Sequence, residues 1–568
     1  MHKIFISVVI YIGLILPFTN FFYEEDDWYI LKNPGQIQCF TDDNYRVIVG
    51  SINGIFSIDK ISKEVTYAVS LVNGLPSKDI KNILYDRSTN YIWVVHEYGL
   101  SYKSLSSFSY SHISFSELIE KGMSSIDDIG ISSSYIWLRR SNYILPLNPF
   151  SGSFININNV GDEMDEIKWQ GSMFGYGGQN IDISGYYSND PNWSIGYRLN
   201  NTNNKYIDYN ILFDKNGNQI IPTLTYIDSE DNFWMGTDLG FLYFSWRSSR
   251  KLEIVDPGLK HGIVSGAIID EDNNWWIFDS NYKRTGHLNK NPVMFTLRDS
   301  DVFLTFWNET DGIWKKFPVD KATNINDVNV NDVLKVGNYL FIATIQGLCR
   351  LDLGNLSYSH PNTPYISSSW SIVNSSNGLY DTAVWKIVEY GEVLFILTSE
   401  GINEIDIKSF SVIPSRLSKY SNIDIYDMII NGDDIILSTA NGIASIDLNN
   451  LSETFIDLSI CNQLQIDDHY LYCLDRGIIR FNLKESKNPE TLVVDNNIRN
   501  FRIFDNYLWL NLINRARLID LNNGESWYYA ESDGITGNEI FNIGGEEDWI
   551  WFIADTGISI YNWKKYHE

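Results

Sequence analysis

The sequence predicts an all-β fold of two β-propellers, with about six or seven four-stranded blades each. Three observations lead to this prediction. A short strand centred on an aromatic residue recurs along the chain, a glycine-led hairpin follows most copies, and the copies outnumber the blades of one ring. Aromatic residues make up 14% of the chain, which suits half-buried strands in which flat rings pack against their neighbours.

Each repeat contains a short apolar run that is entered from a polar turn. Clear copies are residues 91–95, 135–138, 232–237, 339–344, 393–398, 507–510 and 549–553. A second strand follows a turn that often carries glycine, as at Gly54, Gly99, Gly240, Gly347, Gly401, Gly442, Gly477 and Gly557. Asn-Gly and similar pairs supply the positive φ of a tight hairpin, so each unit is at least a hairpin.

A third element precedes the aromatic strand and also begins with glycine. It occurs at residues 73–80, 121–125, 257–264, 377–384 and 533–540. A loop of this kind can carry the chain from the outer strand of one sheet to the inner strand of the next. Four short antiparallel strands in a repeat of roughly forty to fifty residues describe a propeller blade.

The chain contains about twelve such units, whereas a propeller closes with four to eight blades, so we expect two rings. An unassigned hairpin at residues 303–317 lies near mid-chain, and we place the division there. The expected segments are 1–22 as a signal peptide or N-terminal anchor, 23–305 as the first propeller and 306–568 as the second.

The segment Trp28 to Leu31 resembles the strand start at Trp527 to Ala530 and lacks a blade of its own. If it completes the last blade beside Ser559 to Tyr561, one ring is inserted into the other. Tandem rings, with a final outer strand at residues 563–566, are the alternative.

Residues 73–104 resemble the two-component regulator propeller repeat of extracytoplasmic sensor regions in bacterial signalling proteins. The motif comprises the loop Gly74-Leu75-Pro76-Ser77, followed by Tyr85-Asp86, Ile92-Trp93 and Gly99-Leu100. Weaker copies extend the resemblance over residues 28–563. The inserted-ring layout is similar to the PorZ-like double propellers of the type IX secretion apparatus, although no counterpart of their terminal sandwich domain follows Trp563. The resemblance implies a binding or assembly role.

The N-terminus indicates export. Met1-His2-Lys3 precedes an apolar run from Ile4 to Leu16, and an acidic cluster follows at residues 24–27, which is the pattern of a secretory signal peptide. No clear cleavage site stands out, so an uncleaved anchor is the alternative. We expect a periplasmic or cell-surface protein that meets the membrane only through this segment.

The charge of the chain argues against one class of partner, and its cysteine content limits the number of disulfides. The formal net charge of −28 disfavours nucleic acid, because phosphate backbones would be repelled. The four cysteines are too few for a disulfide framework, and whether Cys461 pairs with Cys473 across a hairpin stays open.

We find no catalytic, cofactor-binding or metal-binding motif, and we expect no cofactor. No two histidines have metal-ligand spacing. His96 follows an aromatic strand and His261 lies in a Gly-Leu loop, so either could reach a ring face, although turn or strand-edge positions explain both.

Two other features could bind ligands. The acidic turns 228–232 and 270–274 could hold calcium, but hairpin turns before an aromatic strand explain them as well. The polar aromatic segment 176–209, with Tyr186, Tyr187 and Trp193, could stack on sugars or form a degenerate blade with long turns.

The sequence therefore predicts an exported, non-enzymatic propeller that binds a protein partner or a cell-surface glycan through unknown residues. A sensor-type or secretion-system role follows from the resemblance. A secreted carbohydrate-active hydrolase or lyase with carboxylates in a propeller funnel is the alternative.

Overall fold

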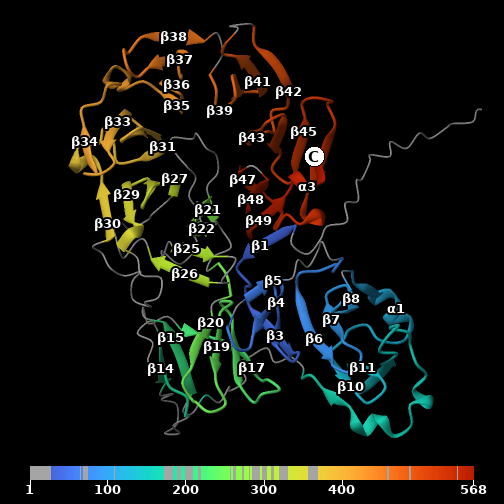
Figure 1. Cartoon of the computed structure of the whole chain (residues 1–568). Coiled ribbons are helices and arrows are strands. Elements are labelled where there is room, and N and C mark those ends of the chain that lie inside the picture. Colours follow the sequence, from blue (N-terminus) through green and yellow to red (C-terminus); the bar gives the residue numbers. More distant parts are fainter. Residues whose placement is uncertain are drawn as a thin grey trace, which may run out of the picture.

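The computed structural model describes residues 27–567, except for 64, 68–73, 108, 172–182, 184, 189–192, 199–208, 215–218, 256, 260–263, 271–273, 280–281, 284–294, 297–302, 309–312, 319–329, 356–368, 457–459, 485–487 and 547. The expected signal segment 1–22 lies outside the described residues. Nearly all regular structure is antiparallel β-sheet, arranged as two propellers (Figure 1). None of the described helices has the length and apolar character needed to span a bilayer.

The smaller propeller contains five sheets built from residues 37–255. In chain order they are β2 (Ile37–Asp42), β3 (Arg46–Ser51), β4 (Gly54–Asp59) and β5 (Val65–Tyr67); β6 (Ile80–Asp86), β7 (Tyr91–His96), β8 (Gly99–Ser104) and β9 (Ser111–Ser114); β10 (Asp128–Ile131), β11 (Ile136–Arg140), β12 (Tyr143–Leu147) and β13 (Lys168–Trp169); β14 (Trp193–Arg198), β15 (Tyr209–Asp214) and β16 (Gln219–Ile220); and β17 (Pro222–Ile227), β18 (Phe233–Thr237), β19 (Leu242–Ser245) and β20 (Glu253–Val255). Helix α1 (Phe115–Glu120) follows β9.

The larger propeller contains seven four-stranded sheets among the described residues. They are β21 (Val264–Ile269), β22 (Asn274–Asp279), β25 (Phe303–Asn308) and β26 (Ile313–Pro318); β27 (Val330–Val336), β28 (Tyr339–Thr344), β29 (Gly347–Asp352) and β30 (Trp370–Val373); β31 (Val384–Tyr390), β32 (Val393–Thr398), β33 (Gly401–Asp406) and β34 (Ser411–Ile413); β35 (Ile425–Asn431), β36 (Asp434–Thr439), β37 (Gly442–Asp447) and β38 (Glu453–Ile456); β39 (Gln463–Asp467), β40 (Tyr470–Leu474), β41 (Gly477–Asn482) and β42 (Glu490–Val494); β43 (Asn500–Phe504), β44 (Tyr507–Asn511), β45 (Ala516–Asp520) and β46 (Ser526–Tyr529); and β47 (Ile540–Glu546), β48 (Trp549–Ala554), β49 (Gly557–Asn562) and β1 (Trp28–Lys32).

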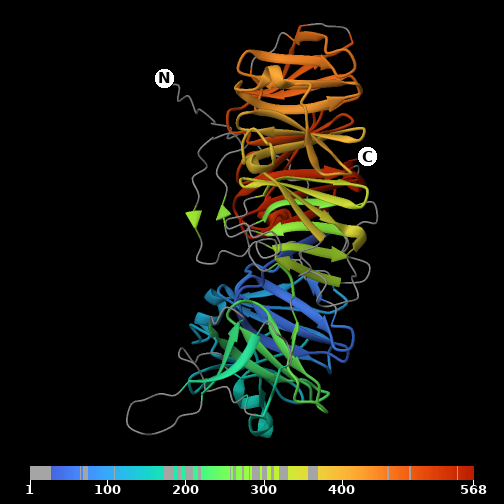
Figure 2. The same ribbon diagram turned by 90° about the vertical axis from the view of Figure 1, so that its left-hand side faces the viewer.

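Two small elements accompany these sheets. Strands β23 (Tyr282–Lys283) and β24 (Phe295–Thr296) form a two-stranded sheet within the connection from β22 to β25. Helix α3 (Lys564–His567) follows β49. Figure 2 shows both propellers edge-on, one above the other.

The recurring sequence pattern explains the blades. The aromatic residue of the repeat lies on the second strand of its sheet and is fully buried, as for Trp93, Trp234 and Trp509. The hairpin glycine is required where the outer strand crosses close by. Gly99 has a φ of +139°, and a Cβ there would lie 2.2 Å from the carbonyl oxygen of Ile113. Only glycine fits both the backbone angle and the close approach.

The larger ring closes through its N-terminal strand. Strand β1 pairs antiparallel with β49, so that Trp28 lies opposite Tyr561, and their rings stack with centroids 4.3 Å apart. Before the strand, buried Asp27 accepts hydrogen bonds from Lys565 Nζ at 2.7 Å and from the Tyr566 hydroxyl. The last sheet thus combines both ends of the described chain.

This pairing places the smaller propeller inside the chain of the larger one, because β2 to β20 lie between β1 and β21. Residues 305 and 306, where the sequence places the division, lie together in β25, which pairs with β22. The two chain crossings between the propellers run side by side. Asn33 Nδ2 donates to the Leu259 carbonyl oxygen at 3.0 Å, and Leu259 N donates to the Lys32 carbonyl oxygen at 3.3 Å.

Asp42 holds three sheets of the smaller propeller together. Its carboxylate accepts from Lys60 Nζ at 2.7 Å, Arg87 at 2.9 Å, Ser229 Oγ at 2.5 Å and the Tyr226 hydroxyl at 2.5 Å. Burial acts to raise the pKa of Asp42, but the hydrogen bonds from Lys60, Ser229 and Tyr226 outweigh it and hold the pKa below its usual value. The ionised form of Asp42 is therefore the form that links these sheets.

Cys461 and Cys473 form a disulfide, with Cα atoms 5.4 Å apart, which settles a pairing that the sequence leaves open. It ties the segment before β39 to β40. The other two cysteines, Cys39 and Cys349, are buried free thiols. Burial raises the pKa of Cys349 to about 12 and raises that of Cys39 further, so neither reacts readily in the native state.

We expect protein purified without reductant to expose two thiols per chain on denaturation, from Cys39 and Cys349, and four after reduction. Thiol titration with a chromogenic disulfide reagent, before and after reduction, measures both values. Four thiols in the unreduced, denatured protein would contradict the disulfide.

We expect Asp42→Asn to destabilise the smaller propeller by about 3 kcal/mol at pH 7, because it leaves Lys60 buried without its counter-charge. Since the folded pKa is depressed, this stability is fully present above the unfolded pKa of about 3.9 and is lost as the pH falls through the folded value.

Urea unfolding at pH 7 and at pH 3 measures this difference. The control is Asp231→Asn, because the Asp231 pair with Arg247 is exposed and should contribute less than about 1 kcal/mol. Equal effects of the two substitutions at pH 7 would show that Asp42 has no special role.

Candidate functional site

The central channel of the larger propeller is walled by the first strands of its seven sheets, β21, β27, β31, β35, β39, β43 and β47. Several of these strands contain a β-bulge near their start, for example between Val330 and Asp332 and between Ile540 and Asn542. The residue just after the bulge is usually polar. Its side chain reaches the next strand around the ring.

Side-chain hydrogen bonds of this kind, here called inter-sheet bonds, join the first strands at five successive boundaries. The carboxylate of Asp332 accepts from Ile387 N at 2.9 Å. Lys386 Nζ donates to Asp427 at 2.5 Å, and the other oxygen of Asp427 accepts from Leu464 N at 2.7 Å. Farther round, Gln465 bonds both Ile503 N and the Phe501 carbonyl oxygen, and Asn500 bonds β47 through Ile543 N and the Phe541 carbonyl oxygen.

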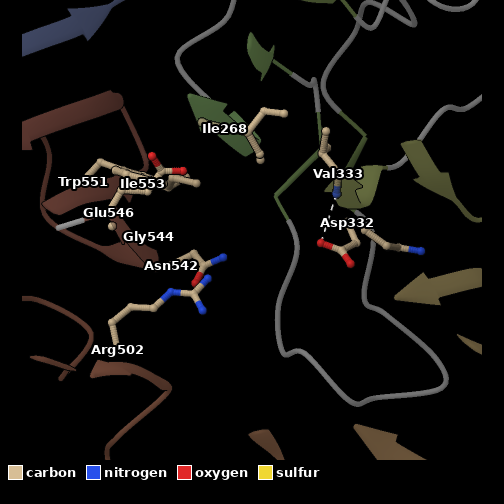
Figure 3. A pocket seen from close by; sticks show the side chains of 13 residues that line it. Ile268, Asp332, Val333, Arg502, Asn542, Gly544, Glu546, Trp551 and Ile553 are labelled. Carbon is tan, nitrogen blue, oxygen red and sulfur yellow. Dashed lines mark hydrogen bonds between the residues drawn. The ribbon is translucent and has the colours of Figure 1, made fainter. Parts of the chain in front are cut away.

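The pattern of inter-sheet bonds changes at β21, which lies between β47 and β27 in the ring. On β21, the residues Gly266, Ala267 and Ile268 line the channel here, and β47 contributes Asn542, Glu546 and the pair Gly544-Gly545. The channel widens there into a cavity of about 290 Å³. Figure 3 shows Arg502, Asn542, Glu546 and Trp551 on one side of it, with Asp332 and Val333 across from them.

The glycines shape this cavity in two ways. A Cβ on Gly544 would lie 2.2 Å from Cε2 of Trp551, so glycine allows the indole to lie against β47. At Gly266, by contrast, a Cβ would meet only Val333 Cγ2 at 3.8 Å and Val330 Cγ1 at 4.0 Å. The space beside Gly266 is therefore open.

Arg502 is the cation of this cavity. Its Nε donates to the Ile543 carbonyl oxygen at 3.1 Å, which orients the guanidinium. Burial lowers the pKa of Arg502, while the charges of Asp332 and Asp427 act in the opposite direction.

Asp332 lies across the cavity from Arg502. Burial raises the pKa of its carboxyl group, against the hydrogen bond from Ile387 N, the charge of Lys386 and the hydrogen bond from Val333 N. Both oxygens accept backbone N–H groups, and Asp427 repeats the arrangement with Met428 N and Leu464 N. Asp332 is therefore a structural link between sheets.

Of the two histidines named from the sequence, His96 lies away from this channel. His96 ends β7 in the smaller propeller, where Nε2 lies 2.6 Å from Ser101 Oγ and Nδ1 accepts from Tyr98 N at 3.1 Å. Burial, followed by the charge of His112, lowers the pKa of His96 to about 4, so it is neutral at pH 7. His261 lies outside the described residues.

The acidic turns act as structural turns. Asp228 accepts from Asn232 N and from the Trp234 indole N–H, both at 2.9 Å, and Asp270 makes the same pair of bonds with Asn274 N and Trp276. Residues 271–273 lie outside the described residues. In the part of the chain that the structure describes, no group of His, Cys, Asp and Glu is placed to hold a metal ion.

Most of the polar aromatic segment 176–209 lies outside the described residues. Tyr186 stacks on Phe233 with ring centroids 4.6 Å apart, and Tyr187 is exposed. Trp193 begins β14. The described residues of the segment therefore belong to the smaller propeller.

Sequence reasoning did not identify Arg502, Asp332 or Gly266. They lie on three first strands that are far apart in the chain, and each looks like an ordinary strand residue. The available signal is the pair Gly544-Gly545 within a strand, where glycine indicates a close approach or a missing side chain.

The described sheets form a double β-propeller. Several solved structures resemble this chain. The extracellular domain of the hybrid two-component system BT4673 from B. thetaiotaomicron is 15% identical, over 93% of this chain and 70% of that chain, with a TM-score of 0.39. PorZ, an essential bacterial surface component of the type-IX secretion system of Porphyromonas gingivalis, is 12% identical, over 94% and 87%, with a TM-score of 0.40.

A second extracellular domain from B. thetaiotaomicron, of the hybrid two-component system BT3049, is 16% identical, over 93% of this chain and 68% of that chain, with a TM-score of 0.28. No protein-family model and no curated protein matches the sequence.

Proposed function

We propose that this chain is an exported binding module of the bacterial cell envelope, whose ligand occupies the channel cavity of the larger propeller. The observation that carries the proposal is the change in the channel wall. Five boundaries are closed by inter-sheet bonds, whereas the small residues Gly266 and Ala267 leave an open space in the cavity that Arg502 also lines. Cavities with a few convergent polar groups are the usual form of a ligand site.

Two features support export. The N-terminal sequence has the pattern of a signal peptide. The buried Cys461–Cys473 disulfide suits an oxidising compartment, because cytosolic thiols are kept reduced. The module would act in the periplasm or at the cell surface, as the ligand-binding part of a sensor or as a PorZ-like assembly component. The cavity favours ligand binding, since assembly alone needs no opening in the channel.

The channel also bears on the hydrolase or lyase alternative. A glycosidase needs two carboxyl groups that can exchange protons with substrate. Asp332 has a raised pKa, but two backbone N–H groups occupy its oxygens, and Asp427 shows the same bonding in the next sheet but one. A structural role therefore fits Asp332 and Asp427 better than acid–base catalysis.

Gly266→Phe tests the site. Its Cβ has room, so we expect the side chain to fill the cavity while the fold is retained. Equilibrium dialysis of purified protein against the small-molecule fraction of a cell-envelope extract, followed by mass spectrometry, measures which compounds are enriched. We expect the wild-type protein to concentrate at least one compound that Gly266→Phe does not.

The control is Asn449→Phe, which adds the same ring at an exposed position of the same propeller. It should bind like the wild type. Enrichment of the same compounds by Gly266→Phe, or of none by the wild type, would contradict a channel ligand.

A further inference from the structure

Resting on the proposed channel site, we infer that its ligand is a small molecule with a single carboxylate group, which pairs with the guanidinium of Arg502. The ligand's carboxylate would accept from the terminal nitrogens of the guanidinium. This assigns a ligand class and a recognition residue to the cavity.

The first step is the bonding state of Arg502. Its Nε is used by the Ile543 carbonyl oxygen, and no acceptor among the described residues bonds its two terminal nitrogens. Asp332 and Asp427 influence it by charge without forming an ion pair with it. The guanidinium therefore presents two terminal nitrogens to the cavity (Figure 3).

Several other cations of this protein that are buried or partly buried form ion pairs with acids. Lys386 bonds Asp427 at 2.5 Å, Lys60 bonds Asp42 at 2.7 Å, and Arg139 bonds Asp128 at 2.5 Å. The two terminal nitrogens of Arg502 bond no described residue, so they are available to an anion in the cavity. The planar fork of arginine suits the two oxygens of a carboxylate.

The charges around the cavity limit the anion to one charge. Asp332 and Glu546 line the cavity, and Asp427 is already paired with Lys386. A phosphate with two negative charges would be repelled by these acids, whereas a carboxylate has a single charge to match Arg502. Asn542 lies beside Arg502 (Figure 3), and its amide nitrogen has no partner among the described residues, so this nitrogen is available as a second donor to the ligand.

The remaining walls describe the rest of the ligand. Trp551, Ile268 and Ile553 are apolar, and Gly266 and Ala267 leave room opposite them. A volume of about 290 Å³ suits a small molecule. A sugar acid and an N-acylated amino acid share the required chemistry, a carboxylate on a compact body with an apolar face.

Thermal unfolding with defined probes tests the inference. The probes are D-galacturonate with D-galactose as its neutral counterpart, N-acetyl-L-leucine with its amide, and propionate with propionamide, all at one ionic strength, and inorganic phosphate. We expect at least one carboxylate to raise the midpoint of the wild-type protein above the effect of its neutral counterpart. The responding pair distinguishes a sugar acid from an amino-acid derivative.

Arg502→Met is the matched variant, because it keeps much of the side-chain volume and removes the charge. We expect it to lower the affinity for the responding carboxylate at least about 30-fold by calorimetry. Without ligand, its unfolding midpoint should stay close to that of the wild type, because the terminal nitrogens of Arg502 bond no described residue. Arg480→Met, which breaks the pair with Glu490 on β41 and β42, should leave carboxylate affinity unchanged.

Three results would overturn the inference. The first is that no carboxylate raises the unfolding midpoint of the wild-type protein more than its neutral counterpart does. The second is a response to phosphate or to neutral probes that Arg502→Met retains, and the third is a marked loss of ligand-free stability in Arg502→Met, which would make Arg502 structural. If the protein binds a neutral ligand and Gly266→Phe abolishes that binding, the channel site is supported and only the carboxylate class of ligand is refuted. Binding that Gly266→Phe does not affect would contradict the channel site itself.

Discussion

The pairing of β1 with β49 is the interaction on which the rest of this structure depends. It brings Trp28 against Tyr561 and completes the seventh sheet of the larger propeller from the two ends of the described chain. Once that sheet is complete, it packs on the first sheet through Trp275 and Trp551, whose ring centroids lie 5.2 Å apart. A closed ring holds its first strands at fixed positions around a channel. The same pairing requires the smaller propeller to leave and re-enter the larger one at a single junction, where Asn33 bonds the returning segment at Leu259.

Closure also explains why the channel can hold a site. Each inter-sheet bond fixes one first strand against the next, from Asp332 on β27 around to Asn500 on β43. In the rest of the wall, Gly544 allows the Trp551 indole to pack against β47. An opening in a rigid ring keeps its shape without ligand, so the guanidinium of Arg502 stays positioned for an anion. Pre-organisation of this kind reduces the ordering that binding would otherwise require.

The local features of the fold could be predicted from sequence, and the site could not. The aromatic strands and glycine hairpins depend on neighbouring residues, so Trp93, Trp234 and Gly99 indicate their own positions. The Trp28 segment could be recognised as an outer strand because its sequence resembles that at Trp527. The hairpin at residues 303–317 looked unattached because an insertion separates β25 from its partner β22. Arg502, Asp332 and Gly266 meet only after seven sheets have closed around the channel, and no spacing in the sequence records that contact.

A disulfide engineered across β1 and β49 is the most direct test of this account. Ile30 lies opposite Ser559, so Ile30→Cys combined with Ser559→Cys should form an intramolecular disulfide on mild oxidation. Non-reducing mass spectrometry of protease digests would show the peptides of residues 30 and 559 linked in monomeric protein. Failure to link in folded protein, or links only between chains, would contradict closure of the larger propeller by its N-terminal strand.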